Sequence, residues 1–387
     1  MTFEEKDKQY IAATYARFPV RLVRGEGRTV YDAEGKSYLD LASGIGVNIF
    51  GYGDAEWTAA VTGQLGALQH ASNLYYTEPC VSLAEALCER SGMEKVFFCN
   101  SGAEANECAI KAARKWGEEH KSPEHFNIVT LKGGFHGRTL AALAATGQEE
   151  YHKDFLPLTP GFLTADPEDA EGLERVVTEH KCAAVMLETV QGEGGVVPLS
   201  EEFLRAAADI AKRHDLLLII DEVQTGMGRT GEFYSYMRFG LQPDIVTSAK
   251  GLGGGLPIGA VLFGERTADV LTPGTHGSTF GGNPVVTAGA LNIVKRLTPE
   301  FLVEVSRKGE RLASALTGAK GIRAVTGRGL MLGVLTEKPA GEVIAALRDE
   351  GVLVIKAKDK VRLLPPLNIT DDEIDFAVRA IKKVCAQ

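Results

Sequence analysis

The sequence lacks an excess of positive charge and any long hydrophobic run. Its 387 residues include 42 Lys and Arg against 51 Asp and Glu, so the net charge is −9. Without a basic cluster, nucleic acids and anionic membrane surfaces are poor partners. No apolar stretch reaches the length of about 20 residues that a transmembrane helix requires. We therefore expect a globular protein that holds any anionic ligand with a few local cations.

Cysteines are few and show no functional spacing. The six cysteines form neither a CxxC motif nor the pattern of a metal site. They fall mostly within apolar helix or strand patterns, which favours reduced thiols in the core. The first ten residues, MTFEEKDKQY, are too polar for a signal peptide. We expect a cytoplasmic protein with no metal, no membrane contact and no nucleic-acid partner.

Strand and helix patterns alternate through the middle of the chain. Helix-length segments with apolar periodicity, such as Ala103–Trp116 and Glu201–His214, lie between most of the candidate strands. This alternation is typical of an α/β layered domain. The candidate strands are Lys95–Cys99, Asn127–Leu131, Phe162–Ala165, Ala183–Leu187, Leu216–Ile220, Ile245–Ser248 and Gly259–Phe263.

The two ends of the chain have a different pattern. Residues 20–42 resemble short strands broken by turns, and Glu300–Leu316 and Asp371–Val384 resemble helices. We therefore expect a small α+β domain from residues 1–47 and 297–387, and a large α/β domain over residues 48–296. The expected strands near the C-terminus are Ile322–Val325, Met331–Leu335, Val352–Ile355 and Arg362–Leu364.

Two apolar strands between residues 216 and 255 end in side chains of opposite charge. The first ends at Asp221, and the second ends at Lys250, just before GLGGG. Open α/β sheets place ligand chemistry at these strand ends. Taken singly, Asp221 can be a strand-end cap and Lys250 a solvated surface residue. Together they suit pyridoxal phosphate, whose aldehyde forms a Schiff base with a lysine and whose ring nitrogen needs a carboxylate. Gln224 could then donate to the ring hydroxyl, and Val223 could pack on the ring.

A candidate phosphate site follows strand KVFFC. Residues Asn100 to Glu104 lead from this strand into a helix, and the N-terminus of a helix binds anions through its free N–H groups and its dipole. An ordinary Ser or Asn N-cap explains the same residues equally well. Only the coincidence with Asp221 and Lys250 favours the ligand-binding interpretation.

A second glycine-rich motif is a chance match. Gly226, Gly228 and Gly231 fit the GxGxxG pattern of dinucleotide-binding proteins. In such proteins the glycines form the strand-to-helix turn itself. Here five residues separate Ile220 from the first glycine, and no helix clearly opens after them. A nicotinamide-dependent dehydrogenase is therefore a weak alternative.

Several motifs resemble the class-III, pyridoxal-phosphate-dependent aminotransferases, and among these most strongly the members that act on N2-acetylornithine. The resemblance covers nearly the whole chain. It implies the fold type I architecture, a large domain with a mainly parallel seven-stranded sheet, and a homodimer with shared active sites. The motifs are HASNLYYTEP (70–79), FFCNSGAEANE (97–107), GGFHGRTLAAL (133–143), QGEGGV (191–196), IIDEVQTGMGRTG (219–231), AKGLGGGLPIGA (249–260), HGSTFGGNP (276–284) and VRLLPPL (361–367).

The resemblance also implies roles for residues around pyridoxal phosphate. Lys250 forms the Schiff base and shuttles a proton during the reaction, and Asp221 pairs with the ring nitrogen. The remaining contacts to the ring come from Gln224, Phe135 and Val223. The phosphate is held by Ser101, Gly102 and Ala103, and the partner subunit's phosphate by Thr279.

Two arginines suit a dicarboxylate acceptor such as 2-oxoglutarate. Arg138 and Arg362 are each ordinary surface or ion-pair candidates when taken singly. Together they can bind both carboxylates in bidentate fashion. The resemblance implies that Glu193 pairs with Arg362 while the amino donor is bound and releases it for the acceptor. Glu188 supports the site from behind, and Ser278 is a further substrate contact.

The identity of the amino donor depends on Ile45. Relatives that act on free ornithine carry a tyrosine there, which grips the free α-amino group, whereas an apolar residue suits an acylated amine. We therefore expect transfer from N2-acetyl-L-ornithine to 2-oxoglutarate, a step of arginine biosynthesis. Because GABA-type relatives also carry isoleucine, succinylornithine, acetyl-lysine, ornithine and GABA remain alternatives.

The chain departs from the family pattern at two places near the substrate side. GYGDAEW (51–57) replaces the usual GHxHP, and Thr189 stands where proline is common. Two other kinds of protein also remain open. An isomerising aminomutase would not need the second arginine, and a non-catalytic pyridoxal-phosphate-binding protein would not need the full set of lysine, acid and arginines.

Overall fold

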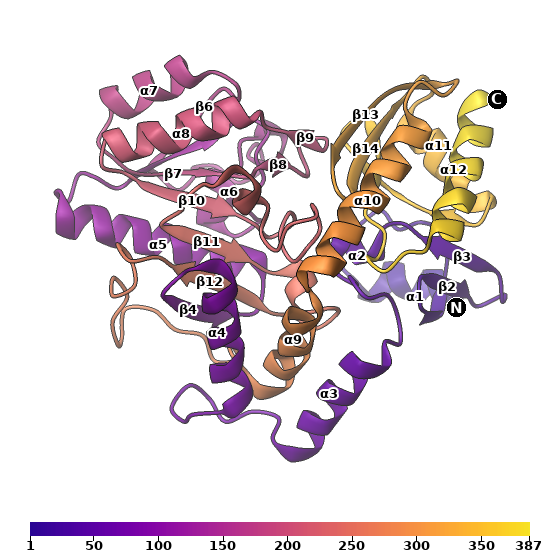
Figure 1. Ribbon diagram of the computed structural model, residues 1–387, viewed down its shortest axis with the longest axis horizontal. Helices are drawn as coiled ribbons and strands as arrows, with labels where there is room; N and C mark the ends of the chain where they lie inside the picture. Colours follow the sequence, from indigo (N-terminus) through magenta and orange to yellow (C-terminus); the bar gives the residue numbers. More distant parts are fainter.

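The computed structural model describes residues 1–387 and shows a larger and a smaller layered region side by side (Figure 1). The larger region is built on a seven-stranded sheet of order β4-β12-β11-β10-β7-β5-β6. Every pair in it is parallel except those of β12, which runs antiparallel to β11 and β4. The predicted mainly parallel sheet is therefore confirmed. Its strands are β4 (Lys95–Cys99), β5 (Asn127–Leu131), β6 (Phe162–Ala165), β7 (Cys182–Leu187), β10 (Leu217–Asp221), β11 (Ile245–Ser248) and β12 (Gly259–Phe263).

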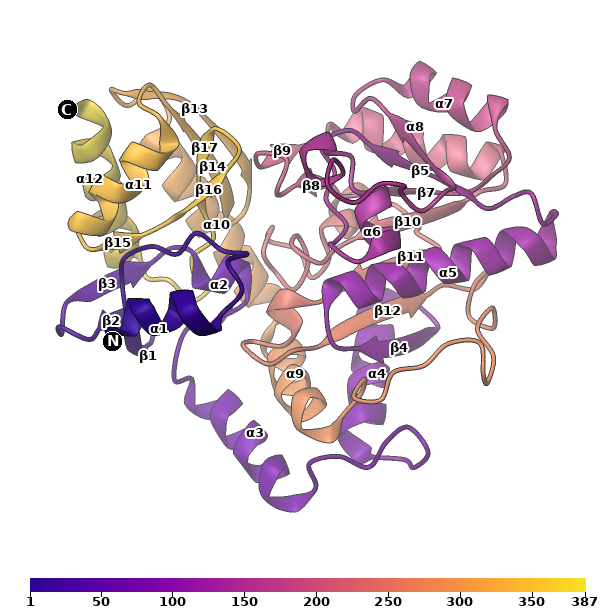
Figure 2. The same ribbon diagram turned by 180° about the vertical axis from the view of Figure 1, so that it is seen from behind.

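Helices cover both faces of this sheet. Alternate residues of β10 point to opposite sides: Leu217 and Ile219 join the apolar cluster of α5, whereas Leu218 and Ile220 join the cluster that contains α8. Figure 1 shows α7 and α8 over one face, and Figure 2 shows α5 across the other. Central strands covered in this way are apolar throughout because neither face meets water. The helices of this region are α3 (Ala55–Ala67), α4 (Glu78–Ser91), α5 (Gly102–His120), α6 (Leu140–Ala145), α7 (Ala170–Glu179), α8 (Glu201–Arg213) and α9 (Pro284–Arg296).

The smaller region combines the two ends of the chain. Strand β15 (Val352–Leu353) pairs in parallel with β3 (Ser37–Asp40), in a sheet of order β1-β2-β3-β15. Both termini lie on this side of the molecule in Figure 2. The domain division that we place at residues 47/48 and 296/297 remains a prediction. The other elements are α1 (Phe3–Tyr10), β1 (Leu22–Glu26), β2 (Thr29–Asp32), α2 (Ser43–Gly46), α10 (Pro299–Leu316), α11 (Ala340–Asp349) and α12 (Asp371–Ala386).

One predicted strand of the smaller region is wrong in detail. Residues 352–355 do not form a single strand, because the chain leaves the first sheet after β15 and enters a second one at β16 (Ile355–Ala357). The buried Val354 lies at the crossing, so the apolar run continues although the strand does not. The second sheet has the order β13-β14-β17-β16 and also contains β13 (Ile322–Arg328), β14 (Met331–Thr336) and β17 (Lys360–Leu363).

Short elements complete the fold. A two-stranded ribbon joins β8 (Val190–Gln191) to β9 (Val197–Pro198), and 3₁₀ turns span η1 (Glu149–Tyr151), η2 (Ser235–Phe239) and η3 (Lys250–Leu252). The six cysteines are all unpaired. None of the helices is both long enough and apolar enough to cross a membrane. No helix opens within residues 226–231, which confirms that the GxGxxG match there is not a dinucleotide-binding turn.

Candidate active site

A cavity of about 470 Å³ opens where β4, β5, β7, β10 and β11 end. Because these strands run in the same direction, the loops that follow them meet at one edge of the sheet. Segments that are far apart in sequence therefore contribute to one cavity. The predicted site residues that line it are Ser101, Gly102, Ala103, Phe135, Arg138, Asp221, Val223, Gln224 and Lys250.

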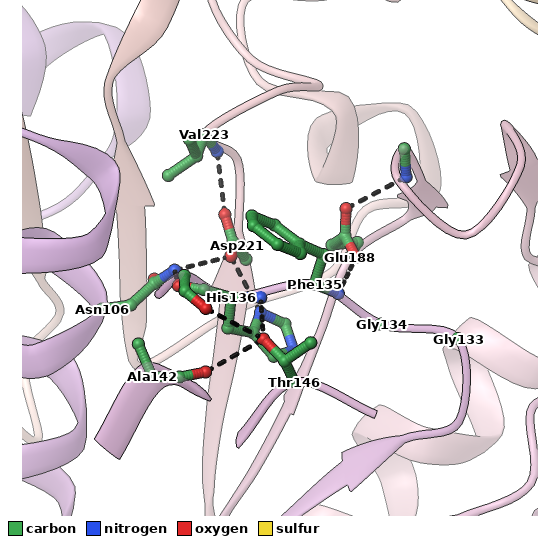
Figure 3. Close-up of polar contacts among 12 residues, drawn as sticks. Asn106, Gly133, Gly134, Phe135, His136, Ala142, Thr146, Glu188, Asp221 and Val223 are labelled. Carbon is green, nitrogen blue, oxygen red and sulfur yellow. Dashed lines mark hydrogen bonds and ion pairs between the residues drawn. The ribbon is translucent and has the colours of Figure 1, made fainter. Parts of the chain in front are cut away.

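Asp221 lies at the centre of a buried hydrogen-bond network (Figure 3). Its Oδ1 accepts from the backbone N–H of Val223 at 3.0 Å, and its Oδ2 accepts from Nδ2 of Asn106 at 2.8 Å. Nδ1 of His136 lies 2.8 Å from the same Oδ2. The side chain is only 3% exposed, and no lysine or arginine forms an ion pair with it. A buried carboxylate without a permanent cation is costly, so this one is well suited to a cationic ligand.

Asn106 and His136 were not among the residues singled out from the sequence. Asn106 is a polar residue on the buried face of α5, and its Nδ2 also donates to the carbonyl of His136 at 2.6 Å. His136 follows Phe135 within the FHGRT motif and is 2% exposed. Burial lowers the pKa of His136, but the hydrogen bond and charge of Asp221 outweigh burial and raise it. A polar residue on an otherwise apolar helix face is the signal that could have identified Asn106.

Glu188 holds the loop that carries Phe135. The carboxylate accepts from the backbone N–H of Phe135 at 2.9 Å and from that of Gly192 at 3.1 Å. Burial, with a further contribution from the charge of Asp221, raises the pKa of Glu188 to about 7. Glu188 therefore ties the loop of Phe135 to the loop of Gly192.

Lys250 lies two residues after the end of β11 and lines the same cavity. Its φ of 43° is in the left-handed region, which residues other than glycine adopt rarely and mostly at functional sites. Burial lowers the pKa of the Lys250 amine, and the charges of Glu193 and Asp221 offset this only in part. A lowered pKa increases the neutral fraction of the amine, which is the form that attacks a carbonyl and accepts a proton.

The N-terminus of α5 also lines the cavity. The hydroxyl of Ser101 accepts from the N–H of Glu104 at 3.2 Å, so this serine is an N-cap as well as a cavity residue. The N–H groups of Gly102 and Ala103 are among those that a helix leaves without an intrahelical partner. A Cβ on Gly102 would lie 2.6 Å from Cγ1 of Val223, so any larger residue there would require Val223 to shift. The arrangement provides an anion site close to the Asp221 carboxylate.

These features fit pyridoxal phosphate, the group implied by the family resemblance. The buried Asp221 suits the protonated ring nitrogen, Lys250 suits the aldehyde, and the start of α5 suits the phosphate. All three face one cavity. Val223 and Phe135 also line it, as expected for residues that contact the ring.

Arg362 and Glu193 form an ion pair beside the cavity. Nη1 of Arg362 lies 2.6 Å from Oε1 of Glu193 and donates to Oε1 of Gln224 at 3.0 Å. The side chain of Arg362 is 3% exposed, whereas that of Glu193 is 23% exposed. Burial raises the pKa of Glu193, but the charge and hydrogen bonds of Arg362 outweigh burial and lower it. Gln224 lines the cavity, so only this side chain separates the ion pair from the cavity.

The other predicted substrate residues, Arg138, Ser278 and Ile45, and the predicted phosphate residue Thr279 are less enclosed. Arg138 is exposed and its guanidinium lies 4.2 Å from the ring centre of Tyr151, a residue that the sequence did not indicate. Thr279 is exposed, and Oγ of Ser278 accepts from Nδ2 of Asn100 at 3.2 Å. Ile45 is 42% exposed and does not line the cavity within one chain. The structure therefore brings the cofactor residues together more completely than the substrate residues.

Comparison with known proteins gives the following similarities. The profile of the family described as aminotransferase class-III matches residues 10–385. A protein named acetylornithine aminotransferase from Haemophilus ducreyi is 46% identical over 386 residues, which cover 99% of this chain and 98% of that protein. One with the same name from Caldanaerobacter subterraneus is 43% identical, with 98% of each chain covered.

Solved structures of two kinds of aminotransferase share the fold. The N-acetylornithine aminotransferase from Stenotrophomonas maltophilia superposes with a TM-score of 0.85 at 36% identity, and covers 99% of this chain and 98% of its own. The ornithine aminotransferase from Toxoplasma gondii ME49 superposes with a TM-score of 0.95 at 32% identity, and covers 99% and 94%. The fold is thus common to proteins whose names specify different amino donors.

Proposed function

The chain belongs to the class-III aminotransferases, and from this premise we propose that it transfers the distal amino group of N2-acetyl-L-ornithine to 2-oxoglutarate. The products are N-acetyl-L-glutamate 5-semialdehyde and L-glutamate. The observation that carries the proposal is the meeting of Asp221, Lys250 and the N-terminus of α5 in one cavity. We further propose that the enzyme acts in the cytoplasm, in arginine biosynthesis.

Lys250 and Asp221 have complementary tasks in this proposal. Pyridoxal phosphate, when bound, supplies an aldehyde that accepts the amino group and a ring that stabilises the developing carbanion. Asp221, oriented by Asn106 and His136, stabilises positive charge on the ring nitrogen. The Nζ of Lys250 takes a proton from the donor carbon in one half-reaction and returns a proton to the keto acid in the other. Its lowered pKa suits both directions of transfer.

Arg362 and Glu193 adapt the site to two substrates in turn. The donor carries one carboxylate, for which the exposed Arg138 is available, and Glu193 then neutralises Arg362. 2-Oxoglutarate carries a second carboxylate that displaces Glu193 from Arg362. Breaking a fully buried pair costs about 3–5 kcal/mol, so the partial exposure of Glu193 favours an exchange.

The donor is assigned from sequence because the fold does not discriminate it. Relatives at more than 40% identity bear the name acetylornithine aminotransferase, and Ile45 offers no hydroxyl to a free α-amino group. Another ω-aminotransferase activity, on succinylornithine, acetyl-lysine, ornithine or GABA, is the second candidate. The same cavity and the same lysine would serve it.

We also propose that two subunits share their active sites. The exposed Thr279 lies beside Phe280, which is 58% exposed, and exposed large side chains follow one another at Leu74, Tyr75 and Tyr76. An apolar surface of this kind marks an interface. Light scattering tests the dimer, and Thr279→Ala tests the sharing, because it should weaken cofactor binding although Thr279 lies outside the cavity of its own chain.

Borohydride trapping tests the chemistry. The protein loaded with pyridoxal phosphate should be yellow, and reduction should place a stable pyridoxyl group on Lys250, as found by peptide mass mapping. Lys121 is a suitable internal control, since burial also lowers its pKa but it lies outside the cavity. A colourless protein, or a label on other lysines alone, would rule out the proposed function.

A further inference from the structure

Four consecutive residues beside the cavity form a left-handed turn. The φ angles of Ser43, Gly44, Ile45 and Gly46 are 43°, 66°, 66° and 74°. L-residues pay roughly 1–2 kcal/mol each for this conformation, and a β-branched residue such as isoleucine is a strong outlier in it. Strain of this kind persists only where the surrounding structure imposes it. Side chains outside the turn must therefore hold it in place.

The turn lies against the backbone next to the lysine. A Cβ on Gly251 would lie 3.6 Å from the carbonyl oxygen of Gly46, an ordinary van der Waals distance, so the two loops are neighbours beside Lys250. Val47, the next residue along, lines the cavity. A shift of this turn would therefore move both the cavity wall and Ile45.

Asp40 fixes the start of the turn. Its Oδ1 accepts from the N–H of Ala42 at 2.8 Å and from that of Ser43 at 3.1 Å, and its Oδ2 also lies 3.1 Å from the Ser43 nitrogen. Asp40 is 4% exposed. The start of the turn has a second anchor, because the hydroxyl of Ser43 donates to the carbonyl of Leu364 at 2.5 Å.

Tyr52 in turn fixes Asp40. Its hydroxyl donates to Oδ2 of Asp40 at 2.7 Å. The tyrosine itself has little freedom, since its backbone exchanges hydrogen bonds with Gly27 at 2.7 and 2.8 Å. A Cβ on Gly25 would lie 2.5 Å from the Tyr52 ring, so the ring packs directly on β1. Tyr52 belongs to GYGDAEW, the segment in which this chain departs from the family pattern.

From these contacts we infer that Tyr52 is a positioning residue for donor selection: through Asp40 it holds the left-handed turn that carries Ile45 and leads into Val47 of the cavity wall. The inference rests on the proposed function, because it concerns the choice between acylated and free ornithine. Tyr52 does not line the cavity, so its effect passes through the turn. The acceptor, held by arginines on other elements, should be affected far less.

The chain offers a matched control for this role. The hydroxyl of Tyr38 donates to Oδ2 of Asp32 at 2.7 Å, and Oδ1 of Asp32 accepts from the N–H groups of Glu34 and Lys36. This is the same arrangement of tyrosine, aspartate and turn, but it lies outside the cavity. Tyr38→Phe and Tyr52→Phe each remove one tyrosine hydroxyl that donates a hydrogen bond to a buried carboxylate. Both variants should therefore destabilise the fold to a similar extent.

The experiment compares both variants with the wild-type holoenzyme. In Tyr52→Phe the ratio of kcat/KM for acetylornithine to that for ornithine should fall about tenfold, as expected for loss of a hydrogen bond to a charged group. KM for 2-oxoglutarate should stay within about twofold of the wild-type value. Hydrogen exchange at the amides of Ala42 and Ser43 should accelerate. Tyr38→Phe should leave the ratio and these amides unchanged.

Two results would overturn the inference. One is an unchanged donor ratio in Tyr52→Phe, and the other is an equal change in Tyr38→Phe. Hydrogen exchange needs no substrate, so unchanged protection of the two amides would reject the role of Tyr52 even if the enzyme used another donor. Failure of the wild-type enzyme to use acetylornithine would instead reject the proposed function.

Discussion

The wall of the cavity around Asp221 is buried and densely hydrogen-bonded, whereas the substrate wall, with Arg138 at the cavity and Glu193 and Ile45 beside it, is more open to solvent. Both oxygens of Asp221 have partners, and these partners are themselves fixed by α5 and by the loop after β5. On the other wall, Arg138 and Ile45 are exposed and Glu193 holds its arginine from a loop. A single cofactor permits a rigid wall, while two substrates of different charge require an adjustable one.

The largest effect is expected on the rigid wall. Asp221→Asn keeps the shape of the side chain but removes its charge. An ion pair at contact distance is worth about 4 kcal/mol at moderate dielectric, so kcat should fall roughly 10²–10³-fold. Steady-state kinetics with acetylornithine and 2-oxoglutarate measure this. Asp244→Asn is the control. Asp244 is also a largely buried carboxylate and accepts a hydrogen bond from the backbone N–H of Leu218, but it lies outside the cavity. Equal losses in both variants would mean that Asp221 acts only on folding.

On the adjustable wall, removal of Arg362 should affect the binding of 2-oxoglutarate more than that of the amino donor. Arg362→Ala should raise KM for 2-oxoglutarate about 10–100-fold, which corresponds to the loss of hydrogen bonds between charged groups. KM for the donor should change only a few-fold, because Glu193 is its partner in that complex. Glu193→Gln should have the opposite effect and raise KM for the donor more than KM for 2-oxoglutarate. If Arg362→Ala weakened both substrates equally, the exchange would be wrong.

Most residues of the rigid wall could be predicted from the sequence, but fewer features of the adjustable wall could. Asp221 and Lys250 end apolar strands, and strands of this kind have a strong pattern. Asn106 and His136 were missed because a single polar residue has no periodicity. The strand predicted over residues 352–355 was wrong since an apolar run does not reveal a change of sheet. The left-handed φ of Ile45 contradicts local preference, and the turn that contains it is held by tertiary contacts of Asp40, Tyr52 and Leu364 that the local sequence does not reveal.

Two carboxylates beside the cavity should respond oppositely to pH. Burial raises the pKa of Glu222, next to Asp221, to about 7, so between its unfolded pKa and 7 the native state binds more protons and stability falls as pH rises. The pKa of Glu193 is lowered, so its contribution is lost as pH falls. The free energy of unfolding of the wild type, measured in urea, should therefore decrease from pH 5 to 8. Each group with a raised pKa contributes at most about 1.4 kcal/mol per pH unit to this decrease.

Substitution of Glu222 isolates its contribution to this pH dependence. Glu222→Gln retains hydrogen-bonding capacity toward Thr225 and Tyr236 and should flatten the slope of stability against pH. Glu202→Gln, on the exposed start of α8, is the control and should leave the slope unchanged. An unchanged slope in Glu222→Gln would show that this carboxyl does not titrate between pH 5 and 8.

The smallest effect concerns strain on the adjustable wall. Ile45→Gly removes both the side chain and the steric cost of the left-handed conformation, whereas Ile45→Ala removes only the side chain beyond Cβ. The glycine variant should therefore be more stable than the alanine variant by about 1 kcal/mol in denaturant unfolding. Both variants should discriminate less between acetylornithine and ornithine. Equal stability of the two variants would indicate that the turn relaxes in solution.

The most direct test is a comparison of kcat/KM for five amino donors, with 2-oxoglutarate as acceptor and the enzyme saturated with pyridoxal phosphate. The donors are acetylornithine, succinylornithine, acetyl-lysine, ornithine and GABA. If the cavity is built as described, acetylornithine gives the highest value, and free ornithine is disfavoured because Ile45 cannot hold its α-amino group. A preference for free ornithine or GABA would contradict the proposed donor, and no transfer from any of the five would contradict the assigned chemistry.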